Sequence, residues 1–286
     1  APLVNAALPA LALSPRGTHL VYVAQSRGDT RLYLRQLDTF SSDPIPGSEG
    51  AMSPFFSPDG QWVAFSAQGQ LKKVSIDGGQ PVVLADSAAL LGGAWGQDDT
   101  VVFAATGAGL SRVSSAGGPV SVATVLDTRA REGGHLWPEL LPDGKSMLLT
   151  VGTTGTNMER ARIVLHSISN GARRTLIEGG TNPRYVESGH IVYSTAGSLM
   201  AVPFDLATGV VTGASVPVLD DVARSELGVA QIALSRSGVL AYVSGGARTP
   251  ARTVVWVDRA GTVTSLPLPP RPYWSPRLSP DGRRIA

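Results

Sequence analysis

An apolar run, a tight turn and a second apolar run recur along this chain at intervals of about forty to fifty residues. The second runs end at Tyr22, Phe65, Phe103, Leu149, Tyr193 and Tyr242. A fixed period on this scale, with a strand pattern in each copy, is typical of a β-propeller, a ring of radially arranged sheets. We therefore expect an all-β fold built from four-stranded blades.

The repeats span approximately residues 8–47, 48–86, 87–126, 132–178, 179–221 and 227–267, and a truncated copy follows at 272–286. The sequence thus predicts one propeller domain with six complete repeats plus a partial seventh, in a six- or seven-bladed ring. Two arrangements of the truncated copy stay open. It forms the inner hairpin of a seventh blade, helped by residues 3–8, or it is exchanged with a neighbouring chain.

The second repeat shows how one blade is built. Its turn is Ser57-Pro58-Asp59-Gly60, in which Pro fixes φ, Asp caps backbone amides and Gly supplies a positive φ. Strands are expected on both sides of this turn, at 54–57 and 62–66. A third strand at 71–76 and a fourth at 81–84 complete the blade.

Composition excludes several classes of function. The formal net charge of +2 is small, and the Arg pairs fall in different repeats, so we expect no nucleic-acid surface. No stretch approaches the roughly 20 apolar residues that a membrane span requires. The absence of cysteine removes disulfides, thiolate catalysis and Cys-rich zinc sites.

The Ser-Pro-Asp-Gly turns at 57–60 and 279–282, each followed by an apolar run, resemble the repeats of TolB-like propellers. Longer stretches resemble the propeller region that follows the membrane segment in bacterial receptor-type serine/threonine protein kinases; these lie at 44–50, 54–62, 71–75, 135–145 and 202–205. This resemblance implies a sensing or binding role, a membrane-anchored parent protein and an extracytoplasmic location, periplasmic or at the cell surface. It supplies no catalytic residue.

The inner strands of a propeller line its central channel, and counting back from each turn gives the residue that faces it. The equivalent positions are Phe55, Ala94, Glu139, Arg184, Ala233 and Arg277. Glu139 and Arg184 therefore come from adjacent blades. One interpretation is a structural ion pair. The other adds Glu132, His135 and Asn182, and makes the five residues the lining of a ligand or cation site at the channel mouth.

Two functional hypotheses follow. The first is a non-catalytic binding or sensor propeller that engages a protein or a small-molecule ligand at the channel mouth. The alternative is a promiscuous metal-dependent hydrolase of lactones or phosphoesters. A divalent cation such as Ca²⁺ would need about six to eight oxygen ligands. Glu132, Glu139 and Asn182, with Glu49 or Glu226, are the candidate ligands.

Overall fold

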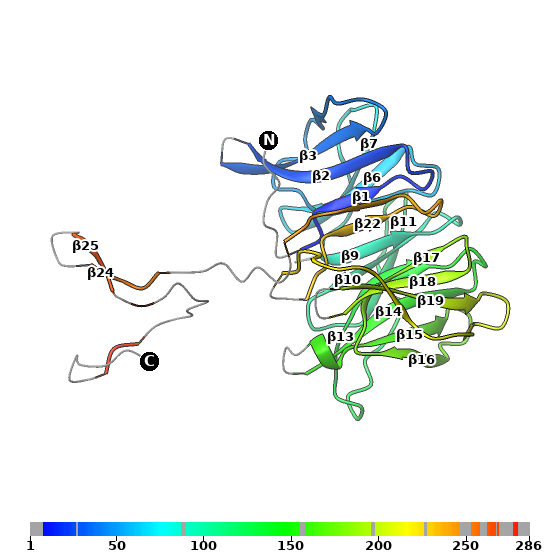
Figure 1. The fold of residues 1–286 in the computed structure, drawn as a ribbon. Coiled ribbons are helices and arrows are strands. Elements are labelled where there is room, and N and C mark those ends of the chain that lie inside the picture. Colours follow the sequence, from blue (N-terminus) through cyan, green and yellow to red (C-terminus); the bar gives the residue numbers. More distant parts are fainter. Residues whose placement is uncertain are drawn as a thin grey trace.

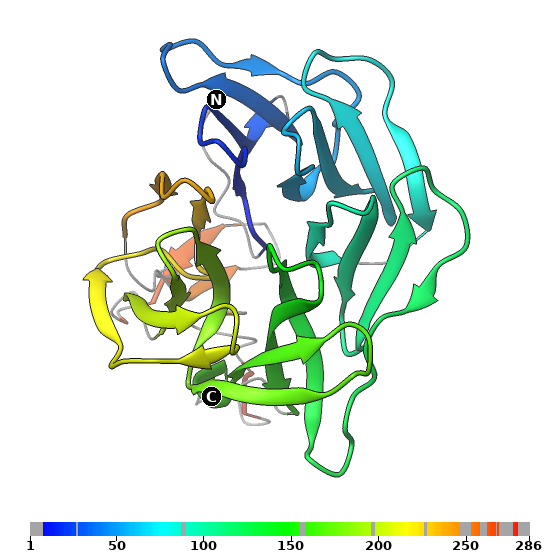
Figure 2. The same cartoon turned by 90° about the vertical axis from the view of Figure 1, so that its right-hand side faces the viewer.

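The computed structural model describes residues 8–26, 28–86, 90–154, 158–195, 198–225, 228–245, 253–257, 262–266, 268 and 277–279. Their strands form antiparallel sheets arranged as blades around a central axis (Figures 1 and 2). In the first four blades the strands follow one another in sequence order from one edge of the sheet to the other. The β-propeller architecture expected from the repeats is therefore confirmed.

Five blades have four or five strands each. The first contains β1 (Leu11–Leu13), β2 (His19–Ser26), β3 (Asp29–Gln36) and β4 (Asp43–Pro44). The second contains β5 (Met52–Phe56), β6 (Trp62–Ala67), β7 (Gln70–Ser75) and β8 (Val82–Asp86). The third contains β9 (Leu90–Trp95), β10 (Thr100–Ala105), β11 (Leu110–Ser114) and β12 (Ser121–Val122).

The fourth blade contains β13 (Glu132–Leu140), β14 (Ser146–Thr153), β15 (Arg162–Ser167) and β16 (Arg173–Glu178), with the short 3₁₀ helix η1 (Met158–Arg160) between β14 and β15. The fifth contains β17 (Thr181–Val186), β18 (His190–Ser194), β19 (Leu199–Asp205), β20 (Val210–Val211) and β21 (Val216–Leu219). Both β20 and β21 pair with β19. In the described part of the chain, no helix is long and apolar enough to cross a membrane.

The expected number of blades is wrong, because the structure shows five where we predicted six complete repeats plus a partial seventh. The repeat at 227–267 gives two separate two-stranded sheets, β22 (Ile232–Leu234) with β23 (Leu240–Tyr242) and β24 (Val255–Val257) with β25 (Val263–Ser265). Two residues join β2 to β3 and β6 to β7, whereas residues 243–254 separate β23 from β24. A connection of this length does not fix the pairing of a hairpin.

The two small sheets lie in different places. The sheet β22–β23 packs between the fifth and first blades, whereas β24–β25 lies apart from the ring (Figure 1). All six residues of β24 and β25 are exposed. Of the truncated repeat at 272–286, only residues 277–279 belong to the described part of the chain. Residues 3–7, which were expected to help it, lie outside the described residues.

The hydrophobic core is divided into clusters, each shared by neighbouring sheets. One cluster joins Phe65 of the second blade to Val21 and Leu32 of the first. The same arrangement continues around the ring, and the last cluster joins Ala233 of β22 to Leu11 and Leu13 of β1. Because each sheet depends on its neighbours for burial of its apolar side chains, the ring is stable only when it is closed.

The inner strands of the second to fifth blades share a backbone irregularity that positions the channel residues. Each contains a residue in the left-handed region of φ, namely Ser53, Gly92, Trp137 and Asn182. The sheet pairing shifts at this point in β5, β13 and β17, which is a β-bulge. The residue two positions later is the one that faces the channel, so the bulge directs that side chain towards the axis.

A glutamine joins the two ends of the ring. Gln231, just before β22, accepts a hydrogen bond from the Ala10 amide at 3.0 Å and donates one to the Leu8 carbonyl at 3.1 Å. Gln231 and Ala10 are 221 residues apart in sequence. Both residues are buried, so the glutamine supplies the polar partners that water cannot supply there.

Replacing Gln231 by Leu should lower the free energy of unfolding by about 1–3 kcal/mol, because the buried Ala10 amide loses its acceptor. Denaturant unfolding followed by circular dichroism measures the effect. Gln70→Leu is the matched control, since Gln70 bonds Asp86 at the surface, and it should change stability by less than about 0.5 kcal/mol. Equal effects of the two substitutions would contradict a closing role for Gln231.

Candidate binding site in the central channel

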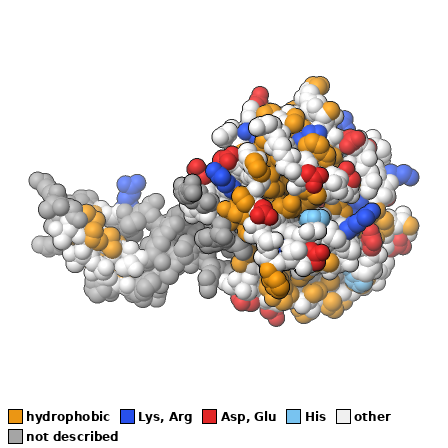
Figure 3. All heavy atoms as spheres, turned by 90° about the horizontal axis from the view of Figure 1, so that it is seen from above, with side chains coloured by type: hydrophobic (Ala, Val, Ile, Leu, Met, Phe, Trp, Pro, Cys, Tyr) orange, Lys and Arg blue, Asp and Glu red, His pale blue; other side chains and the backbone are white. Residues whose placement is uncertain are grey.

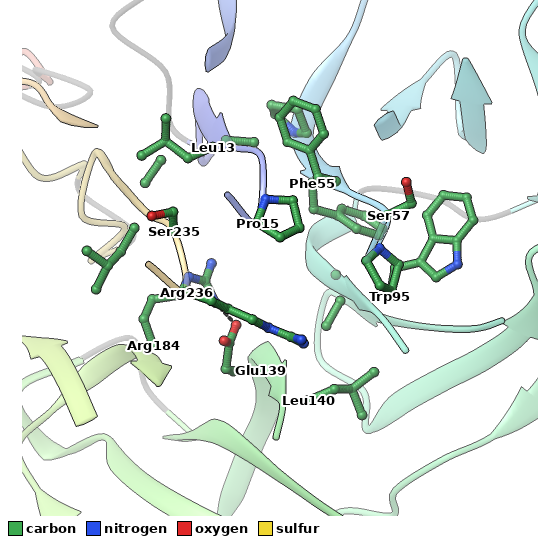
Figure 4. Close-up of a pocket in the computed structure, with 18 of the residues that line it drawn as sticks. Leu13, Pro15, Phe55, Ser57, Trp95, Glu139, Leu140, Arg184, Ser235 and Arg236 are labelled. Carbon is green, nitrogen blue, oxygen red and sulfur yellow. Dashed lines mark hydrogen bonds and ion pairs between the residues drawn. The ribbon is translucent and has the colours of Figure 1, made fainter. Parts of the chain in front are cut away.

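The inner strands surround a cavity of about 120 Å³ at the axis of the ring (Figure 4). Most of the residues that line it are apolar, and include Leu11, Leu13, Phe55, Trp95, Leu140 and Leu234. Three charged side chains also line it: Glu139 of β13, Arg184 of β17 and Arg236 of the turn after β22. The other positions counted from the turns, Ala94 and Ala233, line the cavity as well.

Glu139 and Arg184 form an ion pair, with Arg184 Nη1 3.3 Å from Glu139 Oε2. Their side chains are 18% and 24% exposed, respectively. Burial raises the pKa of Glu139 above its usual value, although the charges of Arg184 and Arg236 and a hydrogen bond from the Tyr185 amide act in the opposite direction. For this carboxylate the cost of burial therefore outweighs the gain from its ion pairing.

The charges in the channel do not balance. An arginine stays protonated at any relevant pH, so Arg184 and Arg236 outnumber the single carboxylate of Glu139. On the face drawn in Figure 3, by contrast, basic and acidic side chains are interspersed. In a partly dry cavity, this surplus of positive charge favours an anionic group.

Glu132 and His135 lie elsewhere, in a buried cluster that does not line the channel cavity. The His135 side chain is 0% exposed. Its Nε2 is 3.1 Å from Glu132 Oε2, and its Nδ1 is 2.6 Å from the hydroxyl of Thr124. Arg173 Nη1 also lies 3.0 Å from His135 Nε2. Both neutral tautomers therefore find partners: Nε2 accepts from Arg173 while Nδ1–H donates to Thr124, or Nε2–H donates to Glu132 while Nδ1 accepts from Thr124.

Two arginines neutralise Glu132. Arg173 Nη1 lies 2.8 Å from its Oε2, and Arg162 Nη2 lies 3.3 Å from its Oε1. Burial acts to raise the pKa of Glu132, but the Asp127 amide, Arg173 and His135 together hold that pKa below its usual value. Since Thr124 follows the last strand of the third blade and Glu132 begins the fourth, the cluster ties two blades together.

Asn182 has a structural environment of its own. The side chain is buried, and its Oδ1 accepts a hydrogen bond from the Ala230 amide at 3.3 Å. The backbone N–H of Asn182 donates a hydrogen bond to the Thr150 hydroxyl at 3.1 Å. The structure therefore divides the five residues predicted for the site among three places, and brings only Glu139 and Arg184 together in the channel.

The donors do not fit a hard divalent cation. Ca²⁺ takes about six to eight oxygen ligands, and the one channel carboxylate faces arginines. Among the described residues, no group of three or more His, Asp or Glu side chains has the geometry to hold a metal ion. Of the other residues predicted as ligands, Glu49 pairs with Arg31 at 3.3 Å, and Glu226 lies outside the described residues.

Counting from the turns missed Arg236. It follows Ser235 in the turn after β22, at the position that Pro15 and Pro58 occupy in the first and second blades. Both prolines also line the channel cavity. Counting one residue forward from the first residue of the turn, as well as two residues back, would have identified Arg236.

The fold is similar to that of TolB from Acinetobacter baumannii, with a TM-score of 0.57 and 18% identity over 74% of this chain and 54% of the TolB chain. A candidate TolB from Agrobacterium tumefaciens has a TM-score of 0.57 and 16% identity, over 74% and 80% of the two chains. Regucalcin from Agrobacterium tumefaciens, a calcium-binding protein, has a TM-score of 0.52 and 15% identity, over 75% and 72%.

These similarities support a TolB-like propeller and, at such low identity, they show the fold alone. This chain spans 54% of the length of the Acinetobacter TolB. No protein-family model and no curated protein matches the sequence. The relation to receptor-type kinases stays a prediction.

The buried cluster predicts acid sensitivity. Burial lowers the pKa of His135 in the folded protein below its ordinary value of 6.5, which applies to the unfolded chain. At a pH between the folded and the unfolded pKa, the unfolded chain therefore binds a proton that the folded protein does not bind. The full stability is therefore present above this pH window, and the part of it that depends on neutral His135 is lost as the pH falls through the window. The free energy of unfolding should decrease by up to about 1.4 kcal/mol per pH unit within it.

Denaturant unfolding at a series of pH values measures this slope. His135→Gln removes the titrating group, so the slope contributed by His135 should disappear in that variant. His190→Gln, at the start of β18 in the fifth blade, should retain it. Identical slopes in the wild type and His135→Gln would show that His135 does not cause the acid sensitivity.

Proposed function

We propose that this chain is a non-catalytic binding propeller whose central channel holds an anionic group, a carboxylate of a protein partner or a small molecule, between Arg184 and Arg236. One observation carries the proposal: two guanidinium groups and a single carboxylate line a cavity whose other lining residues are mostly apolar. Pairs between arginine and a carboxylate are among the stronger hydrogen-bonded contacts in proteins.

The size of the cavity limits what enters it. A volume of about 120 Å³ corresponds to about four water molecules at about 30 Å³ each. A carboxylate with a few carbon atoms fits this space, such as an acidic side chain or the end of a polypeptide. A protein partner would therefore insert one small group, while the rest of the partner would lie outside the channel.

Glu139 competes with the ligand for Arg184. When Glu139 is ionised the three charged groups sum to +1, and when it is protonated they sum to +2, because both arginines keep their charge. Protonation also releases Arg184 from its ion pair. Acidification through the raised pKa of Glu139 is therefore expected to strengthen the binding of an anion that itself stays ionised.

The alternative, a metal-dependent hydrolase, finds no support in the donor set of the channel. The extracytoplasmic location and the link to a membrane-anchored parent protein belong to the present proposal. They are supported by the resemblance of residues 44–50, 54–62 and 135–145 to the kinase propellers, and by the similarity of the fold to TolB.

Isothermal titration calorimetry with propionate and propionamide tests the proposal, because the two probes differ only in charge and hydrogen-bonding pattern. Propionate should bind and propionamide should not. Arg184→Gln and Arg236→Gln should each weaken propionate binding at least about tenfold. Arg31→Gln is the matched control: its ion pair with Glu49 is also 3.3 Å long but is exposed, and its loss should leave binding unchanged.

Ethanesulfonate, which stays ionised in acid, provides the pH arm of this test. Its affinity should rise as pH falls in the wild type, whereas Glu139→Gln should bind it more tightly and without that pH dependence. The proposal would be contradicted if propionate and propionamide bound equally well. It would also be contradicted if neither Arg184→Gln nor Arg236→Gln weakened propionate binding.

A further inference from the structure

A second pocket, of about 350 Å³, lies between the second and third blades. Its lining residues come mainly from the turns that follow β5 and β9, and from β6, β7 and β9 themselves. It meets the channel cavity at Ser57, Pro58 and Trp95, which line both. Pockets of this size commonly hold small molecules.

The side chain of Lys73 in β7 lies over two tryptophans that line this pocket with it. Its Nζ is 4.6 Å from the centre of the Trp62 ring and 5.8 Å from that of the Trp95 ring. The negative faces of the indoles attract the ammonium and hold it in place. Lys73 is half-buried, and among the described residues its ammonium has no hydrogen-bond acceptor and no ion-pair partner. Its N–H donors are therefore available to a ligand.

Two carboxylates reach the same pocket from the turns of neighbouring blades. Oδ1 of Asp59 accepts hydrogen bonds from the Ser57 hydroxyl and the Gln61 amide, which lower the pKa of Asp59 and keep it ionised. Oδ1 of Asp99 accepts one from the Ser115 hydroxyl at 3.2 Å. No other described residue donates a hydrogen bond to Oδ2 of either aspartate. The turns thus hold each carboxylate by one oxygen and leave the other for a ligand.

Opposite charges line this pocket without pairing. In the described part of the chain, no ion pair joins Lys73 to Asp59 or Asp99. An anionic ligand would meet the two carboxylates, and a cationic ligand would meet the lysine. A hydroxyl group is neutral and matches both, because it accepts a hydrogen bond from Lys73 while it donates one to a carboxylate. The pocket therefore favours a neutral molecule with several hydroxyl groups.

The tryptophans and the volume define the shape of this molecule. The indoles of Trp62 and Trp95 form the apolar part of the wall, and Trp62 is only half-buried. A volume of about 350 Å³ equals that of about twelve water molecules at about 30 Å³ each, which is room for a single pyranose. A pyranose ring carries hydroxyl groups around its rim and C–H groups on its faces. One such ring matches the polar and the apolar parts of the wall together.

We propose that the pocket between the second and third blades binds one pyranose ring of a neutral sugar, with neighbouring hydroxyl groups placed between Lys73 and the carboxylates of Asp59 and Asp99. The C–H groups of the ring face the indole wall. This site goes beyond the anion site in the channel. The two share an apolar and hydroxyl-bearing wall, but no charged side chain lines both.

Titration with D-glucose, D-galactose, D-mannose and N-acetyl-D-glucosamine, followed by tryptophan fluorescence and saturation-transfer NMR, tests this site. At least one of the four should bind saturably and change the fluorescence, because two indoles line the pocket. Cyclohexanol, which has a ring but a single hydroxyl group, should not bind. The methyl glycoside of the sugar that binds separates two sources: binding of both indicates the terminal unit of a larger glycan, and binding of the free sugar alone indicates a monosaccharide.

Lys73→Met keeps the apolar stem of the side chain and removes the donor, so it should weaken sugar binding about tenfold. Asp99→Asn keeps an acceptor for Ser115 but replaces the charged acceptor, and it should weaken binding at least about fivefold. Lys72→Met is the matched control, since Lys72 points to the other face of β7 and bonds Gln68 at 3.2 Å. It should leave binding unchanged.

Arg184→Gln distinguishes this pocket from the channel, and it should leave sugar binding unchanged. The absence of saturable binding by any of the four sugars would overturn the proposal. Sugar binding that neither Lys73→Met nor Asp99→Asn weakens would overturn it as well. Loss of sugar binding in Arg184→Gln would place the sugar in the channel, which also contradicts the proposal.

Discussion

Closure of the ring is the constraint on which the rest of the structure depends. Each apolar cluster is shared by neighbouring sheets, so no blade buries its own faces. The ring closes through a small sheet, β22–β23, whose Ala233 packs against Leu11 and Leu13, and through Gln231, which bonds the backbone of residues 8 and 10. The channel exists only because this contact brings the ends of the ring together.

The bulges of the inner strands connect this closure to the chemistry of the channel. A non-glycine residue in the left-handed region costs about 1–3 kcal/mol, and such a residue persists only where its surroundings hold it. Trp137 packs against Gly92 of the preceding blade, where an added Cβ would meet its ring at 3.0 Å. Asn182 is held by Thr150 and Ala230. These contacts between blades fix Glu139 and Arg184, two residues further on, as neighbours in the channel.

The sequence could predict the architecture and part of the site, and bulges explain much of the rest. Turn residues mark where each inner strand ends, so counting back two positions reaches Glu139 and Arg184 correctly. Counting further back along the strand fails, because Trp137 has a left-handed backbone and interrupts the alternation of side chains between the two faces of the strand. In the sequence, Trp137 looks like an ordinary strand residue. Glu132 and His135 precede this bulge, and they lie in the buried cluster instead of the channel. The blade count was wrong because the strand pattern at 255–257 is visible, whereas its failure to pair with β23 is not.

Amide hydrogen exchange at the junction of the first blade with β22–β23 tests ring closure most directly. If the ring is closed, the Ala10 amide and the amides of β22 should exchange as slowly as those of β5, because they open only with the whole ring. If Ala10 and β22 exchange at the rate of an unstructured peptide while β5 stays protected, the ring is open. The channel that depends on closure would then be contradicted.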